Sequence, residues 1–412
     1  MSVSVLYTRV NSNTWKIAFF FSFIALLVDG ADFMLLSYSL NSIKHDFGLT
    51  SVEAGLLSSI TLAGMAIGGA MGGWACDKFG RVKMIVFSIV IFSIFTCALG
   101  FTHSFWQFSV LRFIASLGLG SVYIGASILM AEYVPTRFRT TVLGTLQAGW
   151  TVGYMVAALL SGWIIPEFGW RYLFFTAFFP LLIIIFMYFL VPEPPAWEKN
   201  KSVKQVAKSS NSSTWKIIFQ DKKTRNTFIL WALAAGCLQF GYYGLNSWMP
   251  AYLETELHMK FKSMTGYMVG SYTAMILGKI LSGYIADKFG RRFTYAFGAI
   301  STAAFLPIIV YYNSPTNILY LLVIFGFLYG IPYGVNATYM SESFPTNVRG
   351  TAFGGSYNFG KVGAALAPAA IGYLATGGSI GLGFLVMGMA YFVCGVIPAL
   401  FIKDKQYDTQ AA

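Results

Sequence analysis

Residues 73–81 read GWACDKFGR and residues 283–291 read GYIADKFGR, so one nine-residue pattern recurs 210 residues further along the chain. A second, unrelated pattern recurs at the same distance: residues 132–139 read EYVPTRFR and residues 342–349 read ESFPTNVR. Two patterns that share one offset indicate a duplicated unit rather than chance similarity. The sequence therefore predicts two structurally related halves, each carrying both patterns.

The composition shows which solvent surrounds these halves. Of the 412 residues, 56% are hydrophobic and only 11% are charged, whereas soluble proteins have roughly 25% charged residues. So few charges cannot cover a water-exposed surface, which excludes a soluble enzyme, and a disordered chain would contain far fewer aromatic residues. The four cysteines lie inside apolar runs without paired spacing, so we expect no disulfide framework, no metal site and no cofactor.

Apolar runs bounded by charged or turn residues predict twelve transmembrane helices, each about 20 residues long. The polar, lysine-rich stretch 192–225 divides the runs six and six. This predicts an N-terminal six-helix bundle over 1–191, a cytoplasmic linker over 192–225 and a C-terminal six-helix bundle over 226–412. The predicted spans are 15–40, 54–75, 83–102, 105–131, 141–165, 170–191, 226–252, 264–286, 293–312, 317–341, 350–376 and 380–402.

The basic residues predict the orientation of these spans. When both tails and every second loop are assigned to one side of the membrane, that side carries 21 Lys and Arg residues and the other side carries four. The positive-inside rule then places both termini and the linker in the cytoplasm of a bacterial cell, with the spans in the inner membrane. The net charge of +12 reflects this topology, so the expected partner is the lipid bilayer and not a nucleic acid.

Five ionisable residues lie inside the predicted spans, away from their ends: Asp29, Asp32, Arg112, Lys279 and Lys361. Such a residue costs at least about 2.5–3.5 kcal/mol to insert, so each one suggests a function. Asp29 and Asp32 lie three residues apart on one helix face, at a depth similar to that of Arg112. Carboxylates beside a guanidinium influence one another's proton affinity, so this trio predicts a proton-coupling site. A static ion pair that only fixes helix packing is the alternative.

Lys361 lies near the predicted bilayer midplane, where it must face protein or a cavity, and we expect it to bind an anion. Lys279 lies nearer the cytoplasmic side, where it could snorkel or form an ion pair. Aromatic side chains inside the spans could stack on a flat ligand. The alternative for any one of these side chains is a place in the aromatic belt at the membrane interface. The wider set of polar and aromatic candidates includes Tyr38, Tyr123, Gln147, Trp150, Tyr333 and Asn336. The predicted substrate-binding residues are Arg112, Lys361, Tyr154, Tyr242, Tyr243, Asn246, Tyr357 and Asn358.

The charged residues of the two repeated patterns lie at the cytoplasmic membrane surface, far from any cavity in mid-bilayer. They predict a gating latch of partly exposed ion pairs, which biases a conformational equilibrium and takes no part in substrate chemistry. The latch residues are Asp77, Arg81, Glu132, Arg139, Asp287, Arg291, Glu342 and Arg349.

These motifs carry a family resemblance. The pattern at 73–81 and 283–291 resembles the signature of the major facilitator superfamily, and the Glu-x-x-Pro-Thr-x-x-Arg element resembles that of its sugar- and organic-acid-transporting branches. The Asp-Gly-x-Asp element at 29–32 is similar to the first helix of aromatic-acid:proton symporters. Arg112, followed by glycines, resembles the fourth-helix motif, although Ser116 replaces one of its glycines.

The resemblance implies an all-α membrane protein with twelve transmembrane helices in two pseudo-symmetric six-helix bundles, working by alternating access. It also implies a proton-coupled symporter, and the usual member acts as a monomer. The expected cargo is a small organic anion, with cis,cis-muconate or a related aromatic-acid catabolite as substrate. Muconate is a planar conjugated dicarboxylate, for which Arg112 and Lys361 would supply two cations.

Other functions remain open at this point. One group comprises carriers of benzoate-, sialate- or sugar-acid-like substrates, and another comprises drug:proton antiporters of the same fold. Antiporters usually have a Gly-Pro pair in the fifth helix, whereas Gly149 and Gly153 occur here without the proline, which favours uptake. An enzyme is not expected, because the three histidines fall in predicted periplasmic loops with no nucleophile–base arrangement.

Overall fold

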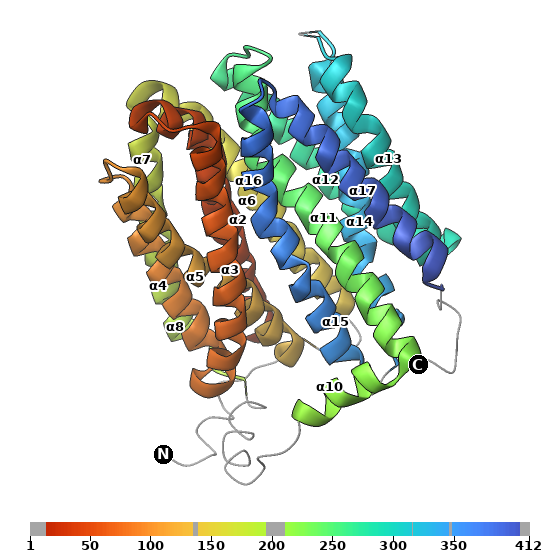
Figure 1. Ribbon diagram of the computed structural model, residues 1–412. Helices are drawn as coiled ribbons and strands as arrows, with labels where there is room; N and C mark the ends of the chain where they lie inside the picture. Colours follow the sequence, from red (N-terminus) through yellow and green to blue (C-terminus); the bar gives the residue numbers. More distant parts are fainter. Residues whose placement is uncertain (1–13, 135–138, 195–210, 315, 346–347, 404–412) are drawn as a thin grey trace. The chain divides into compact units, whose positions relative to one another are not determined.

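A computed structural model describes residues 14–134, 139–194, 211–314, 316–345 and 348–403 (Figure 1). All regular secondary structure in these ranges is helical. Helices are expected in a bilayer, because a helix satisfies its backbone hydrogen bonds within one segment.

The helices of the first six spans follow one another with short connections. Their bounds are α2 (Thr14–Phe47), α3 (Ser51–Phe79), α4 (Arg81–Leu99), α5 (Phe105–Tyr133), α6 (Arg139–Phe168), α7 (Trp170–Phe175) and α8 (Phe179–Leu190). The sixth predicted span is thus divided, with a 3-10 turn at Thr176–Phe178 between α7 and α8. Pro180 lies in the first turn of α8, where a missing N–H costs no helical hydrogen bond.

The later helices include one that the span prediction did not contain. Their bounds are α10 (Asn211–Gln220), α11 (Lys222–Thr255), α12 (Phe261–Phe289), α13 (Arg291–Tyr311), α14 (Ile318–Glu342), α15 (Arg349–Phe359), α16 (Lys361–Ala375) and α17 (Ile380–Phe401). α10 lies within the predicted linker and is too short to cross a bilayer. Trp215 and Phe219, four residues apart on α10, both pack against Phe228 of α11, which explains a helix in a polar stretch.

Asp221 is the N-cap of α11. Its carboxylate accepts hydrogen bonds from the hydroxyl and the backbone N–H of Thr224, at 2.6 and 2.8 Å. These bonds stabilise the ionised form and hold the pKa of Asp221 below its usual value. The cap explains why α11 begins at Lys222, before the apolar run that starts at residue 226.

Ten helical segments in the described part of the chain are long and apolar enough to cross a membrane. The two other predicted spans are α12 and the α15–α16 pair. Serine, threonine, tyrosine and glycine dilute the apolar character of α12, and a break at Gly360 separates α15 from α16. With these two, the described residues form twelve spans, the number that the sequence predicts.

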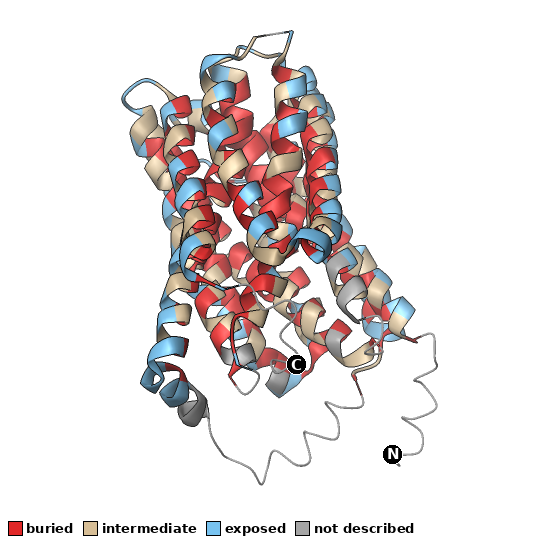
Figure 2. Cartoon of the chain, turned by 90° about the vertical axis from the view of Figure 1, so that its right-hand side faces the viewer, coloured by how far each residue is buried: buried red, intermediate tan, exposed pale blue. Residues whose placement is uncertain are grey.

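Many large apolar side chains remain exposed along the helices. Trp106 and Phe189 are each 75% exposed, and Figure 2 shows exposed residues distributed along the helices rather than only at their ends. Such a surface would favour aggregation in water, whereas lipid tails solvate it. The helices therefore have the surface of a multi-pass membrane protein.

The described residues form two compact units. The first unit contains 14–47 and 60–194, and the second unit contains 48–59 and 211–403. α3 runs through both, because its first turns belong to the second unit. There, the Ser59 hydroxyl accepts a hydrogen bond from the backbone N–H of Ala369, at 3.1 Å.

Glycines allow close helix pairs within each unit. In the first unit, a β-carbon added at Gly68 of α3 would overlap the carbonyl group of Leu117 on α5. In the second unit, a β-carbon at Gly330 of α14 would overlap the carbonyl group of Met275 on α12. Small residues at such crossings let helix backbones touch, which is a common means of packing in membranes.

Ser116, which replaces a glycine of the expected fourth-helix motif, packs directly against α3. A β-carbon at Gly64 would overlap the Ser116 hydroxyl oxygen, so the glycine on α3 provides the space that the serine needs. The Ser116 hydroxyl also donates a hydrogen bond to the Phe113 carbonyl oxygen at 2.7 Å, which satisfies its polar group. The replacement therefore leaves the α3–α5 contact tight.

Candidate functional site

A buried ion pair joins two helices of the first unit. Arg112 of α5 donates from Nη1 to the Asp32 carboxylate on α2 at 2.5 Å, and from Nη2 to the Asp32 carbonyl oxygen at 3.1 Å. Its Nε donates to the Thr61 hydroxyl on α3 at 3.1 Å. The side chains of Arg112 and Asp32 are 0% and 2% exposed. Three helices thus hold one guanidinium group, and an interior charge of this kind is retained only with such partners.

Asp29 lies three residues before Asp32 on α2 and is also fully buried. Between them, Gly30 faces α6, where a β-carbon would overlap the Trp150 carbonyl oxygen. Close packing therefore explains the glycine of the Asp-Gly-x-Asp element, because the missing side chain lets α2 lie against α6. The same contact fixes the depth of both carboxylates.

An aromatic group lies next to the acidic face in the first unit. Tyr154 of α6 is fully buried and stacks on Phe33 of α2, with ring centroids 6.1 Å apart and planes at 24°. Trp150 lies 6.0 Å from Tyr154 and 6.2 Å from Phe33. Tyr154 is therefore adjacent to the residue that follows Asp32.

The second unit contains a cluster of tyrosines that we call the tyrosine cluster: Tyr242, Tyr243, Tyr329 and Tyr333. Tyr242 of α11 is almost parallel to Tyr329 of α14, at 5.1 Å and 7°, and lies 4.4 Å from Tyr333 and 5.2 Å from Tyr243. The Tyr329 hydroxyl donates to the Tyr242 carbonyl oxygen at 2.8 Å and accepts from the Asn246 amide at 2.6 Å. Asn246 thus orients the cluster.

Lys361 begins α16, directly after the break at Gly360, and is half-buried. The backbone here lies against α11, because a β-carbon at Gly360 would be only 2.5 Å from the Gln239 amide nitrogen. Gln239 also donates to the Tyr357 carbonyl oxygen at 2.8 Å. Asn358 is exposed and donates to the Gly354 carbonyl oxygen of its own helix at 2.8 Å.

The offset of 210 residues pairs each site residue with a counterpart in the other unit, and the counterparts differ in charge. Those of Asp29, Asp32 and Arg112 are uncharged: Gln239, Tyr242 and Leu322. Those of Lys279 and Lys361 are also uncharged: Gly69 and Thr151. Of the five in-span ionisable residues, the two carboxylates and the arginine therefore lie in the first unit, and the two lysines lie in the second unit with the tyrosine cluster.

One polar pair of the first unit has polar counterparts in the second. Gln147 donates to the Tyr123 hydroxyl at 2.5 Å in the first unit. The counterparts of Gln147 and Tyr123 are Tyr357 and Tyr333 in the second unit. Both positions of the pair therefore carry polar side chains in each half, although the residue types differ.

The two repeated patterns form ion pairs inside each unit. In the first unit, Arg81 contacts Glu132 through Nη2 at 2.8 Å and through Nε at 3.1 and 3.2 Å. In the second unit, Arg291 contacts Asp287 at 2.6 Å and Glu342 at 3.5 Å. The remaining predicted latch residues have side chains outside the described part of the structure: Asp77, Arg139 and Arg349.

The glycine before each of these arginines makes the turn between two helices. Gly80 and Gly290 have φ values of 119° and 96°, a region that favours glycine. Each turn places the following arginine at the first position of a helix, next to the end of the preceding one. The glycine before each arginine therefore allows the turn that places the arginine next to the end of the preceding helix.

Glu193 joins the first-unit group, although its place in the linker concealed it from sequence reasoning. Its carboxylate accepts hydrogen bonds from the backbone N–H groups of Arg81, Val82 and Lys83, at 2.7, 3.2 and 3.0 Å. A carboxylate at a helix N-terminus satisfies unpaired donors and is favoured by the helix dipole. Thr61, Gln239 and Tyr329 were also missed, because polar residues of these types occur in many transmembrane helices.

The model of the Major Facilitator Superfamily matches residues 22–356 and 262–411 of this chain. The chain belongs to the Major Facilitator Superfamily. This membership confirms the predicted fold class of twelve transmembrane helices in two pseudo-symmetric six-helix bundles.

Several relatives have names that refer to organic acids, and two of them illustrate the range of identity. The chain is 71% identical to the cis,cis-muconate transport protein of Acinetobacter baylyi over 404 residues, which cover 98% of each chain. It is 26% identical to the benzoate transport protein of the same organism, over 95% of this chain and 90% of that protein.

Solved superfamily members show the same fold. The partially occluded, inward-open structure of the xylose transporter XylE from E. coli matches with a TM-score of 0.79 and 19% identity. The match covers 96% of this chain and 99% of that one. At this identity the similarity concerns the fold alone.

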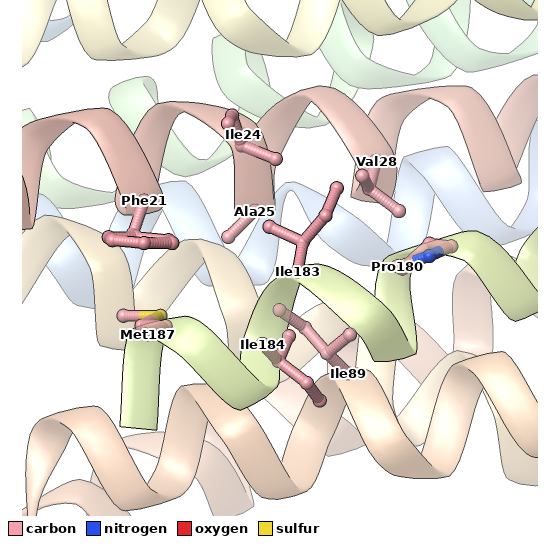
Figure 3. Close-up of a pocket in the computed structure, with 9 residues that line it drawn as sticks. All are labelled: Phe21, Ile24, Ala25, Val28, Ile89, Pro180, Ile183, Ile184 and Met187. Carbon is pink, nitrogen blue, oxygen red and sulfur yellow. The ribbon is translucent and has the colours of Figure 1, made fainter. Parts of the chain in front are cut away.

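A pocket between α2, α4 and α8 lies elsewhere in the first unit (Figure 3). Its lining is apolar and includes Phe21, Ile89 and Met187. Such a lining offers nothing to a carboxylate, since a desolvated anion needs charged or hydrogen-bonding partners. The charged residues inside the spans are therefore better candidates for binding an anion than this pocket.

Proposed function

We propose that the protein is a proton-coupled symporter that imports cis,cis-muconate, or a related acid from aromatic-compound breakdown, by alternating access. The observation that carries this proposal is the 71% identity, over 98% of both chains, to a cis,cis-muconate transport protein. In this proposal the protein lies in the bacterial inner membrane with both termini in the cytoplasm, and works as a monomer without a cofactor.

Asp32 and Arg112 are the proposed core of proton coupling. With Asp32 ionised, the 2.5 Å contact holds Arg112 between three helices. Protonation of Asp32 removes the charge that holds the guanidinium group, so Arg112 can move and favour a second conformation. Asp29, buried on the same face, is the second proton acceptor in this scheme.

The proposed substrate-binding residues belong mainly to the second unit, and Tyr154 is the candidate in the first unit. Lys361 is half-buried at a helix break, and a lysine there offers three donors to a carboxylate. The flat rings of Tyr154, Tyr242, Tyr243 and Tyr357 suit a conjugated chain. Asn246 supports the wall that Tyr329 and Tyr242 form, and Asn358 is a further polar candidate.

The substrate prediction can be tested in proteoliposomes with labelled muconate. An imposed pH gradient, acidic outside, should drive accumulation, and an uncoupler should abolish it. Unlabelled muconate should compete at least about tenfold better than benzoate or sialate, because only a dicarboxylate uses two cations. Stronger competition by benzoate or sialate would assign another acid. If a proton gradient directed outward drove accumulation of the substrate inside, the protein would be an antiporter.

The ion pairs of Arg81 and Glu132, and of Arg291 and Glu342, are the proposed gate. The Glu132 side chain is 22% exposed, so its pair should contribute about 1 kcal/mol, which corresponds to roughly fivefold in a conformational equilibrium. Glu132→Gln should therefore change the maximal transport rate several-fold at unchanged KM. Arg81→Gln combined with Glu132→Gln should have an effect smaller than the product of the single effects. A large rise in KM would instead place Glu132 in the substrate site.

A further inference from the structure

Lys279 points from α12 towards α14. Its Nζ lies 5.7 Å from the centre of the Tyr333 ring, and the residue is half-buried. The backbone of Lys279 also touches α14, because a β-carbon at Gly330 would be 3.1 Å from the Lys279 nitrogen. The direction of the side chain therefore differs from that of a lysine that snorkels along its own helix to water.

The ring beneath Lys279 belongs to the tyrosine cluster. Tyr333 lies 4.4 Å from Tyr242, which is stacked on Tyr329. The hydrogen bonds from Asn246 to Tyr329 and from Tyr329 to α11 hold the tyrosine cluster in place. An ammonium group above a ring keeps N–H donors on the side away from the ring, where an anion can approach.

The charge balance of the second unit also favours an anionic ligand. The segments 222–253, 257–286, 288–341 and 343–403 contain no Asp or Glu. Two lysines, Lys279 and Lys361, nevertheless lie inside its spans. A ligand carboxylate would therefore meet positive charge and no repelling carboxylate from these segments.

Lys361 lies on the helix pair that packs against α11, one of the two helices that carry the tyrosine cluster. Tyr357 lies four residues before Lys361, and its carbonyl oxygen accepts a hydrogen bond from Gln239 of α11 at 2.8 Å. Gly360 between them has right-handed helical φ and ψ values of −60° and −25°. Residues four apart share a helix face, so Lys361 and Tyr357 lie on one side of α15–α16, and Gly360 between them lies against α11, the helix that carries Tyr242.

We propose that Lys279 is a substrate-binding residue that binds one carboxylate of a conjugated dicarboxylate whose chain lies against Tyr333 and Tyr242, while Lys361 binds the other carboxylate. This inference rests on the proposed function and replaces one prediction made from the sequence, the pairing of Arg112 with Lys361 as the two cations for the substrate. Arg112 is held by Asp32 and Thr61, so Lys279 takes the place of Arg112 as the second cation for the substrate.

The test compares muconate with 2,4-hexadienoate, which has the same six-carbon diene chain but only one carboxylate. Affinities are measured on purified protein from the ligand-dependent rise in melting temperature, which requires folded protein but no turnover. The preference of the wild-type protein for muconate over hexadienoate should fall at least about tenfold in Lys279→Met. Lys279→Arg should keep that preference within about threefold, because it keeps the charge.

Lys262→Met is the matched control, since Lys262 is exposed at the other end of the same helix. It should leave both affinities unchanged. If Lys279→Met does not fold, Lys279→Gln replaces it under the same criteria. Equal loss of both affinities would show a structural role, and no loss of either would show that Lys279 does not contact the substrate; each result would overturn the inference. Failure of the wild-type protein to transport muconate would instead refute the proposed function.

Discussion

Asp32→Asn is expected to abolish accumulation of muconate against its concentration gradient. Asp32 lies 2.5 Å from Arg112, and both side chains are almost fully buried. Asparagine leaves the guanidinium charge without its carboxylate, and removal of one partner of a buried pair typically costs about 3–5 kcal/mol. Asparagine also cannot bind and release a proton. Uptake driven by an imposed pH gradient should therefore fall to background, while exchange across an equilibrated membrane persists.

An exposed ion pair of similar length provides the control. Asp46 contacts Arg171 at 2.6 Å, with side chains 41% and 31% exposed, and such pairs contribute about 0–1 kcal/mol. Asp46→Asn should keep full accumulation at equal protein amount. Asp29→Asn should lose it as Asp32→Asn does. Normal accumulation by both Asp29→Asn and Asp32→Asn would exclude these carboxylates from proton coupling.

Gly120→Val is expected to cause a large loss of folded protein. Gly120 lies on α5 against α3, and a β-carbon there would be within 2.7 Å of the Cα, carbonyl carbon and oxygen of Met65. Backbone atoms cannot rotate away as a side chain can, so the helices must separate. We expect a destabilisation of about 3 kcal/mol or more. The melting temperature in detergent and the yield of monodisperse protein measure this effect.

Gly266→Val makes the same chemical change in an open place. No heavy atom lies within 4 Å of a β-carbon built at Gly266 on α12, so the variant should remain within about 0.5 kcal/mol of the wild-type stability. Similar melting temperatures for Gly120→Val and Gly266→Val would mean that α3 and α5 pack less tightly than the structure indicates.

The helical spans could be predicted because each depends on residues that are neighbours along the chain. The exceptions also have local causes: Pro180 and a 3-10 turn divide the sixth span, and Gly360 divides the eleventh. α10 was missed because it lies in a polar stretch and depends on tertiary contacts, among them those of Trp215 and Phe219 with Phe228 of α11. The candidate site was less predictable, since a sequence shows which residues are costly in lipid but does not show their partners.

The sequence by itself determined that this protein crosses a membrane with two related sets of six helices. Apolar runs as long as the bilayer is thick must become helices, and two motifs with one offset require a duplicated unit. Only the tertiary structure decided that Asp32 meets Arg112, 80 residues away, that Glu193 caps α4, and that Lys279 lies over Tyr333. The physical reason is that these contacts depend on how helices cross and which faces they present, and close backbone packing at glycines sets both.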